Sequence, residues 1–233
     1  MAMPLLLLPG LLCDARLWRD VLPALEGLAA PVVADLTRDD SMAAMAARAI
    51  AAMPPGRFAV AGLSMGGYVA FEVWRQAPGR VAALALLDTS ARPDAPEATQ
   101  RRRDLLALSR QGQFRGVTPR LLPSLIHPTR LGTPLAQEVM DMAERIGAEA
   151  FLRQQTAIMG RADSRPDLPG ITVPTLVAVG EEDVLTPPAL AEEMAAAIPG
   201  AALARLPGSG HLPTMEVPEA AGAALREWLL RAA

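Results

Sequence analysis

The stretch VAGLSMGGYVAFE, residues 60–72, joins an apolar run to a helical pattern through a short turn rich in glycine. Ser64 stands at this turn, with Gly62 two residues before it and Gly66 two residues after it. The pattern G-x-S-x-G between a strand and a helix is typical of a nucleophile elbow, in which a sharp turn exposes the serine hydroxyl above a sheet. A turn that merely packs tightly could carry the same letters. We predict a nucleophile, because the pattern lies between the two elements that it requires.

Composition limits the classes of function. The chain has 233 residues, of which 51% are apolar and 20% charged, as expected of a globular protein with a large core. Its net charge of −3 argues against nucleic-acid binding. All 22 basic residues are arginine, which excludes chemistry that needs a lysine amine. With two histidines and one cysteine, Cys13, we expect no metal site and treat that cysteine as structural.

The first residues, MAMPLLLLPGLLCD, resemble a signal peptide only in their apolar content. No basic residue precedes the apolar run, Pro9 and Gly10 interrupt it, and Leu12 stands where a signal peptide needs a small residue. No apolar run approaches the roughly 20 residues of a membrane span. We therefore expect a cytoplasmic protein.

Short apolar runs alternate with longer helical patterns along most of the chain. We predict strands at residues 3–8, 31–36, 58–63, 81–87, 175–179 and 202–206, and helices at about 14–28, 41–53, 65–76, 189–197 and 217–231. Continuous apolar strands that alternate with helices indicate an α/β fold, in which a mostly parallel sheet of about six strands is covered on both faces.

One segment breaks this alternation. Residues 92–169 contain three stretches with apolar spacing near 3.6 and no convincing strand. We predict a helical cap at 92–169, inserted after the fourth strand into a core formed by residues 1–91 and 170–233. Such a cap would cover the carboxyl ends of the strands, the edge at which parallel sheets bind ligands.

A serine nucleophile needs a base, which an acid must orient. His211 lies in a loop after the last strand, at the same predicted edge as Ser64, whereas His127 lies inside the cap. We predict that His211 is the base. Asp183 follows the fifth strand and Asp88 the fourth, so both are candidate acids. Asp183 precedes His211 by 28 residues, one strand–helix–strand unit, so these two loops should be neighbours, and with the chain order Ser–Asp–His this favours Asp183.

Four segments, LLPGLL (7–12), GLSMGG (62–67), GEEDVLTPP (180–188) and GSGHLPTMEVP (208–218), together resemble the α/β-hydrolase family. The resemblance implies that the backbone N–H groups of Leu11 and Met65 form an oxyanion hole. Two features depart from many members: Pro9 replaces a histidine, and no residues remain for an N-terminal hairpin. We therefore expect about six strands instead of eight.

The combined pattern predicts a serine hydrolase that cleaves carboxylic esters of a small or medium acyl substrate through an acyl-enzyme, with no cofactor. We list as candidate substrate contacts Leu12, Trp18, His127, Leu185 and Leu212. A cofactor-free perhydrolase or haloperoxidase, or an enol-lactone hydrolase, could use the same triad. A ligand-binding protein that has lost catalysis is an alternative of another class. A dinucleotide-binding enzyme is excluded, because GLSMGG lacks the G-x-G-x-x-G pattern.

The first half of the predicted cap is basic. Residues 92–130 hold eight arginines against three acidic residues, a local net charge of +5. Such a charge run is commonly a solvated face. The alternative is that it attracts an anionic substrate group or an acidic carrier protein, because the planar guanidinium binds carboxylates and phosphates in pairs of hydrogen bonds.

Overall fold

The computed structural model describes residues 2–232 and contains one six-stranded sheet, in which all pairings are parallel. The strand order is β2-β1-β3-β4-β5-β6. The strands are β1 (Met3–Leu8), β2 (Ala29–Val33), β3 (Phe58–Leu63), β4 (Val81–Leu87), β5 (Thr175–Gly180) and β6 (Ala202–Leu206). The three central strands β3, β4 and β5 are buried along their whole length, which explains their uninterrupted apolar sequences.

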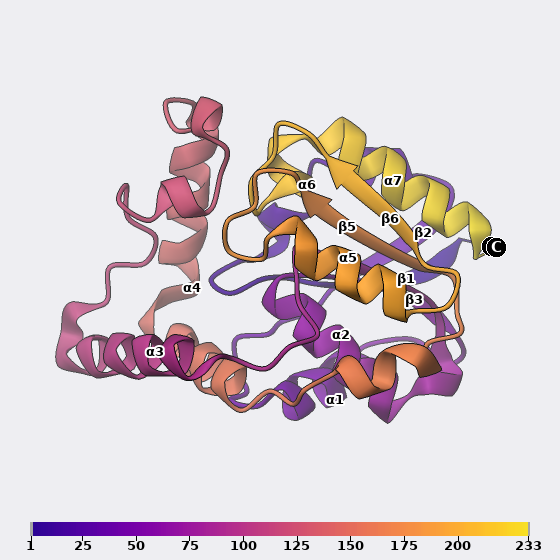
Figure 1. Ribbon diagram of the computed structural model, residues 1–233, viewed down its shortest axis with the longest axis horizontal. Helices are drawn as coiled ribbons and strands as arrows, with labels where there is room; N and C mark the ends of the chain where they lie inside the picture. The colour runs from indigo at the N-terminus through magenta and orange to yellow at the C-terminus, as the bar shows by residue number, and fades with distance from the viewer. Residues whose placement is uncertain (1, 233) are drawn as a thin grey trace.

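Helices cover both faces of the sheet (Figure 1). On one face, α1 (Met42–Ala51), α2 (Met65–Gln76) and α5 (Pro188–Ala197) bury their apolar sides in a common cluster. On the other face, α7 (Pro218–Arg231) packs through Leu225 and Trp228. The short helix α6 (Pro213–Glu216) leads into α7. The predicted α/β fold with six parallel strands is confirmed.

The predicted helix at residues 14–28 is wrong. This stretch instead forms two short 3₁₀ turns, Ala15–Leu17 and Leu22–Leu25. Pro23 lies inside the expected helix, where it lacks the N–H of a helical hydrogen bond and its ring would clash with the preceding turn. Gly27 has a φ of 76°, a value outside the helical region. The apolar spacing is nevertheless meaningful, because Leu17, Val21 and Leu25 are all buried.

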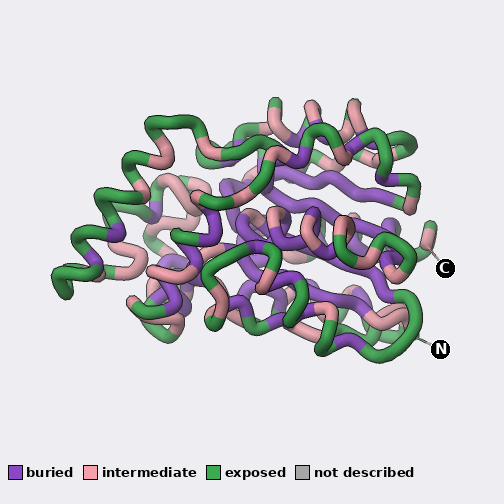
Figure 2. The backbone as a smooth tube through the Cα atoms, turned by 90° about the horizontal axis from the view of Figure 1, so that it is seen from below, coloured by how far each residue is buried: buried purple, intermediate pink, exposed green. Residues whose placement is uncertain are grey.

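The segment between β4 and β5 is helical and contains no strand, as predicted. It comprises α3 (Pro96–Leu108), a π-helical turn (Ser109–Gln113), three short 3₁₀ turns and α4 (Pro134–Met159). Gly147 interrupts α4 with a φ of 78° and a ψ of 174°. Figure 1 shows α3 and much of α4 to one side of the sheet. α3 buries only Leu106 and α4 buries ten residues, whereas the strands of the sheet are mostly buried (Figure 2). We call residues 92–169 the helical insertion; their assignment to a separate domain stays a prediction.

No helix among the described residues is long and apolar enough to cross a membrane.

Candidate active site

Ser64 lies at the sharp turn between β3 and α2. Its φ of 56° and ψ of −116° are unusual for a residue with a side chain, and a strained backbone of this kind costs on the order of 1–3 kcal/mol. The flanking glycines allow the close packing that this turn requires. A Cβ on Gly62 would lie 2.3 Å from the carbonyl oxygen of Gly66, and one on Gly66 would lie 1.9 Å from that of Leu8. Neither site can hold a larger residue without displacing backbone.

Three side chains from separate loops form one line of hydrogen bonds. His211 Nε2 lies 2.8 Å from Ser64 Oγ, and His211 Nδ1 lies 2.8 Å from Asp183 Oδ2. His211 and Asp183 are buried, whereas Ser64 is partly exposed. A serine is activated when a base contacts both its hydroxyl and an orienting carboxylate, and this arrangement is present here.

Asp183 is held in place from several directions. Its Oδ1 accepts hydrogen bonds from the N–H groups of Leu185 and Thr186, and its Oδ2 accepts one from Thr186 Oγ1 at 2.6 Å. Burial would raise the pKa of Asp183, but His211 and the hydrogen bonds from Thr186 outweigh it and lower the pKa to about 2. This carboxyl is therefore ionised at neutral pH, as the partner of a histidine base must be.

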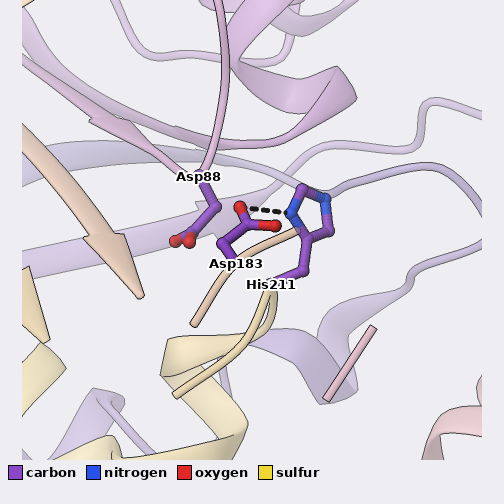
Figure 3. Close-up of side chains that lie close together, drawn as sticks. All are labelled: Asp88, Asp183 and His211. Atoms are coloured by element: carbon purple, nitrogen blue, oxygen red, sulfur yellow. Dashed lines mark hydrogen bonds and ion pairs between the residues drawn. The ribbon is translucent and has the colours of Figure 1, made fainter. Parts of the chain in front are cut away.

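Asp88, the other candidate acid, lies beside Asp183 but makes different contacts. Figure 3 shows Asp183 between Asp88 and His211, with its hydrogen bond directed at the histidine. Asp88 Oδ1 accepts a hydrogen bond from Gly180 N–H at 2.8 Å, and its Oδ2 has no partner among the described residues. Burial and then the charge of Asp183 raise the pKa of Asp88 well above its ordinary value. The two neighbouring carboxyls thus have pKa values shifted in opposite directions.

The raised pKa of Asp88 predicts a pH-dependent stability. Because the folded protein holds this proton more tightly than the unfolded chain, the stabilising contribution is complete below the ordinary pKa of 3.8 and is lost as the pH rises through the folded-state pKa. Asp88→Asn stays neutral at every pH. Relative to that variant, the parent protein should lose up to about 1.4 kcal/mol of unfolding free energy per pH unit above about pH 4.

Urea denaturation of both proteins at a series of pH values measures this difference. Asp40→Asn is the matched control, because Asp40 is exposed; its stability curve should run parallel to that of the parent protein. Equal pH dependence of the parent protein and Asp88→Asn would show that Asp88 is ionised in the folded state.

The predicted oxyanion loop lies against the nucleophile. A Cβ on Gly10 would be 3.5 Å from Cβ of Ser64, so the loop after β1 touches the turn after β3. Met65 is the first residue of α2, where a backbone N–H has no partner within the helix. Leu11 follows Gly10 and is partly buried. Both predicted donors are therefore near Ser64, and their role stays a prediction.

The predicted substrate contacts differ in how far they are buried. Leu12 and Leu212 are buried next to the site loops, and Leu185 is exposed beside Asp183. Trp18 is completely buried in the core cluster on the α7 face of the sheet, so it does not line the surface of the site. His127 is half-buried, and its ring Nδ1 lies 2.7 Å from Thr129 Oγ1. Substrate contact by these residues stays untested.

Two buried polar residues near the site were not predicted from the sequence. Glu216 accepts hydrogen bonds from the N–H groups of Gly210, Leu212 and His127 and from Ser209 Oγ. It therefore holds the loop of the predicted base and ties it to the helical insertion. Gln154, from α4, accepts a hydrogen bond from Leu12 N–H. Glu216 contacts His127, and Gln154 contacts Leu12. Each contact joins segments that are distant in the sequence, so no local sequence pattern identifies either residue.

The remaining reactive groups have simpler explanations. Burial and then the charge of Asp14 raise the pKa of the Cys13 thiol to about 12, which keeps it protonated and unreactive at neutral pH. Asp88, Asp183 and His211 present ligand atoms within 4.8 Å of one another, close enough to surround a metal. Both ring nitrogens of His211 are already hydrogen-bonded within the triad, however, so the cluster fits proton transfer better.

The eight arginines of residues 92–130 fall into two groups. Arg92 pairs with Glu193, Arg102 pairs with Asp94, and Arg130 donates to the backbone oxygen of Glu216. In the part of the chain that the structure describes, five others are exposed and form no ion pair; these are Arg101, Arg103, Arg110, Arg115 and Arg120. We call these five the free arginines.

Comparison with known proteins gives a consistent picture. Residues 34–218 match the model of the alpha/beta hydrolase fold family. A pimeloyl-[acyl-carrier protein] methyl ester esterase of Neisseria meningitidis is 30% identical over 190 residues, which cover 79% of this chain and 74% of that protein. The structure of a thermophilic esterase from Thermogutta terrifontis superposes with a TM-score of 0.87 at 32% identity, over 100% of this chain and 91% of that one. An enol-lactonase from Burkholderia xenovorans shares the fold, with a TM-score of 0.88 at 23% identity over 99% and 92% of the two chains.

Proposed function

Since this chain belongs to the α/β-hydrolase family and is an ester-cleaving enzyme of that fold, we propose that it hydrolyses carboxylic esters through an acyl-enzyme on Ser64. The observation that carries the proposal is the pair of 2.8 Å hydrogen bonds that His211 makes to Ser64 and Asp183. The family match alone supports hydrolysis, and these contacts support a specific nucleophile, base and acid.

The proposed reaction has two halves. His211 Nε2 takes the proton of Ser64 as its Oγ attacks the ester carbonyl, and the oxyanion is stabilised by the N–H groups of Leu11 and Met65. The tetrahedral intermediate collapses, the C–O bond to the alcohol breaks, and His211 returns the proton to the alcohol. Water then attacks the acyl-enzyme with the same base, which releases the acid and free Ser64. Asp183 orients the imidazole and stabilises its charged form.

Other reactions on the same triad remain second candidates. An enol-lactone is a cyclic ester, so it would follow the same steps, and a perhydrolase would use peroxide in place of water. An ester substrate is favoured, because the relative from Neisseria meningitidis and the structure from Thermogutta terrifontis, 30% and 32% identical to this chain, are both named as esterases.

The free arginines support a preference for an anionic substrate. They place exposed positive charge on the helical insertion. The insertion contacts the predicted oxyanion loop, because Phe151 and Leu12 belong to the same buried cluster. The relative from Neisseria meningitidis acts on an acyl group held by a carrier protein. We propose that the partner of the free arginines is a substrate carboxylate or an acidic carrier protein.

A hydrolysis screen tests the proposed function and this preference together. We expect kcat/KM for a short dicarboxylate monoester to exceed that for a neutral ester of equal length by about tenfold at low salt, a difference of about 1.4 kcal/mol. The advantage should shrink at high salt, because exposed charges are screened within a Debye length of about 8 Å at physiological ionic strength. The double substitution Arg101→Gln and Arg103→Gln should also reduce the advantage of the anionic ester.

Arg231→Gln is the control for general charge effects, since Arg231 is exposed at the end of α7. This substitution should leave the ratio of kcat/KM between the two esters unchanged. Equal rates for both esters at every salt concentration would assign the free arginines to a solvated surface. Failure to cleave any ester across a range of chain lengths would overturn the proposed function itself.

A further inference from the structure

Gln154 is a buried polar residue where the helical insertion meets the sheet. Its side chain has no exposed surface, and both ends of its amide are hydrogen-bonded. Oε1 accepts from Leu12 N–H at 3.1 Å, and Nε2 donates to the backbone oxygen of Leu36 at 3.1 Å. A buried amide is unfavourable unless it is bonded in this way. Gln154 thus joins α4 to the loops that follow β1 and β2.

The Leu12 N–H belongs to a turn with an unusual backbone. Cys13 N–H donates to the oxygen of Gly10 at 3.1 Å, which closes the four-residue turn 10–13. Leu12, the third residue of this turn, has a φ of 59°. Positive φ at the third position is characteristic of a type II turn, where glycine is preferred because a side chain is crowded there. Leucine disfavours this conformation, so something must stabilise it.

The hydrogen bond that Leu12 N–H donates to Gln154 Oε1 supplies that stabilisation. If Leu12 relaxed to negative φ, the turn would become type I, and the peptide between Leu11 and Leu12 would rotate. Its N–H would then point away from Gln154, leaving a buried amide oxygen without its partner. The same peptide carries the oxygen of Leu11, which accepts a hydrogen bond from Cys13 Sγ at 3.4 Å. The contact with Gln154 therefore selects one of two peptide orientations.

This orientation matters because the turn contains Leu11. We propose that Gln154 is a positioning residue for the oxyanion hole: by holding Leu12 in the left-handed conformation, it fixes the turn that presents the Leu11 N–H beside Ser64. The inference rests on the proposed function, in which Leu11 is an oxyanion donor. It also makes the helical insertion part of the catalytic apparatus, because a shift of α4 would move this turn.

Gln154→Met tests the inference, since methionine has a similar length but neither accepts nor donates a strong hydrogen bond. We expect kcat on a neutral ester to fall about 10- to 100-fold, with KM changed less than about threefold, because an oxyanion donor acts mainly in the transition state. Gln155→Met is the matched control. Gln155 is equally buried but accepts from Arg102, away from the turn, so kcat should be unchanged.

A double-mutant cycle separates positioning from loss of packing. Glycine adopts positive φ without strain, so a turn that contains Leu12→Gly no longer needs Gln154. In that background, Gln154→Met should lower kcat less than about threefold. An equal loss in both backgrounds, or no loss in the parent background, would overturn the inference.

Two further measurements keep the test decisive. Should Gln154→Met fail to fold, Gln154→Glu replaces it, because a protonated carboxyl in this buried position keeps both an acceptor for Leu12 N–H and a donor for the Leu36 oxygen. Its kcat per phosphonate-titrated site should stay within about threefold of the parent protein, and a tenfold loss would contradict the inference. If the parent protein cleaves no ester, the proposed function fails separately. The inferred contact is then tested by hydrogen exchange of the Leu12 amide, which Gln154→Met should accelerate.

Discussion

Ser64→Ala should lower kcat for ester hydrolysis about a million-fold while the protein remains folded, the loss expected when a serine nucleophile is removed. The hydroxyl is the only group of the triad that would form a bond to the substrate. His211 Nε2, 2.8 Å from Ser64 Oγ in the parent protein, would have no nucleophile to deprotonate. The fold should tolerate alanine, because the strained turn depends on Gly62 and Gly66 and not on the hydroxyl.

A fluorophosphonate probe with mass spectrometry measures the same property without a substrate. Ser64 in the parent protein should be labelled to completion, and Ser64→Ala should carry no label. Ser41→Ala is the control: Ser41 caps the N-terminus of α1 by accepting from Ala44 N–H, so its loss affects stability and not labelling. Label on another serine in the Ser64→Ala variant would move the nucleophile elsewhere.

Asp183→Asn should lower kcat about 10⁴-fold, because an amide in place of the carboxylate stabilises the wrong tautomer of His211. The carboxylate accepts from Nδ1–H and leaves Nε2 free to accept the serine proton. An asparagine side chain can instead donate to Nδ1, which moves the ring proton to Nε2. The expected change is therefore in kcat, with KM little altered.

Asp88→Asn is the matched control for that substitution. Asp88 is buried beside Asp183, and burial together with the charge of Asp183 raises its pKa, so a neutral amide resembles the form of this side chain that its surroundings favour. The asparagine oxygen can still accept from Gly180 N–H. We expect kcat to stay within about tenfold of the parent protein. If Asp88→Asn proved the more damaging of the two, the orienting acid would lie after β4.

The strands and the nucleophile turn were predictable because their signals are local. The strands are apolar runs bounded by turn residues, and β1, β3, β4 and β6 have the predicted bounds. The helix at 14–28 was wrongly predicted, because apolar spacing near 3.6 also fits two 3₁₀ turns that bury the same leucines. A proline within such a pattern is stronger evidence against a helix than the apolar spacing is for one.

The candidate site was predictable only in part. Few histidines and a known chain order left little choice for the base and acid, and the structure brings Ser64, Asp183 and His211 together. Their supporting residues were not predictable. The contact of Gln154 with Leu12 spans 142 positions, and it depends on a backbone conformation that leucine rarely adopts. No glycine and no motif marks Leu12 as a residue with positive φ, in contrast to Ser64, whose turn is marked by the flanking glycines.

The order of the strands also bears on how separate molecules of this protein meet one another. β2 and β6 form the two edges of the sheet, and an unpaired edge can add a strand from another copy. Pro31 stands in the middle of β2, opposite Leu5, and its nitrogen carries no hydrogen to donate. At the other edge, β6 exposes Arg205, which pairs with Glu192. A missing donor at one edge and a charged pair at the other both oppose the pairing of sheets from two copies of this protein.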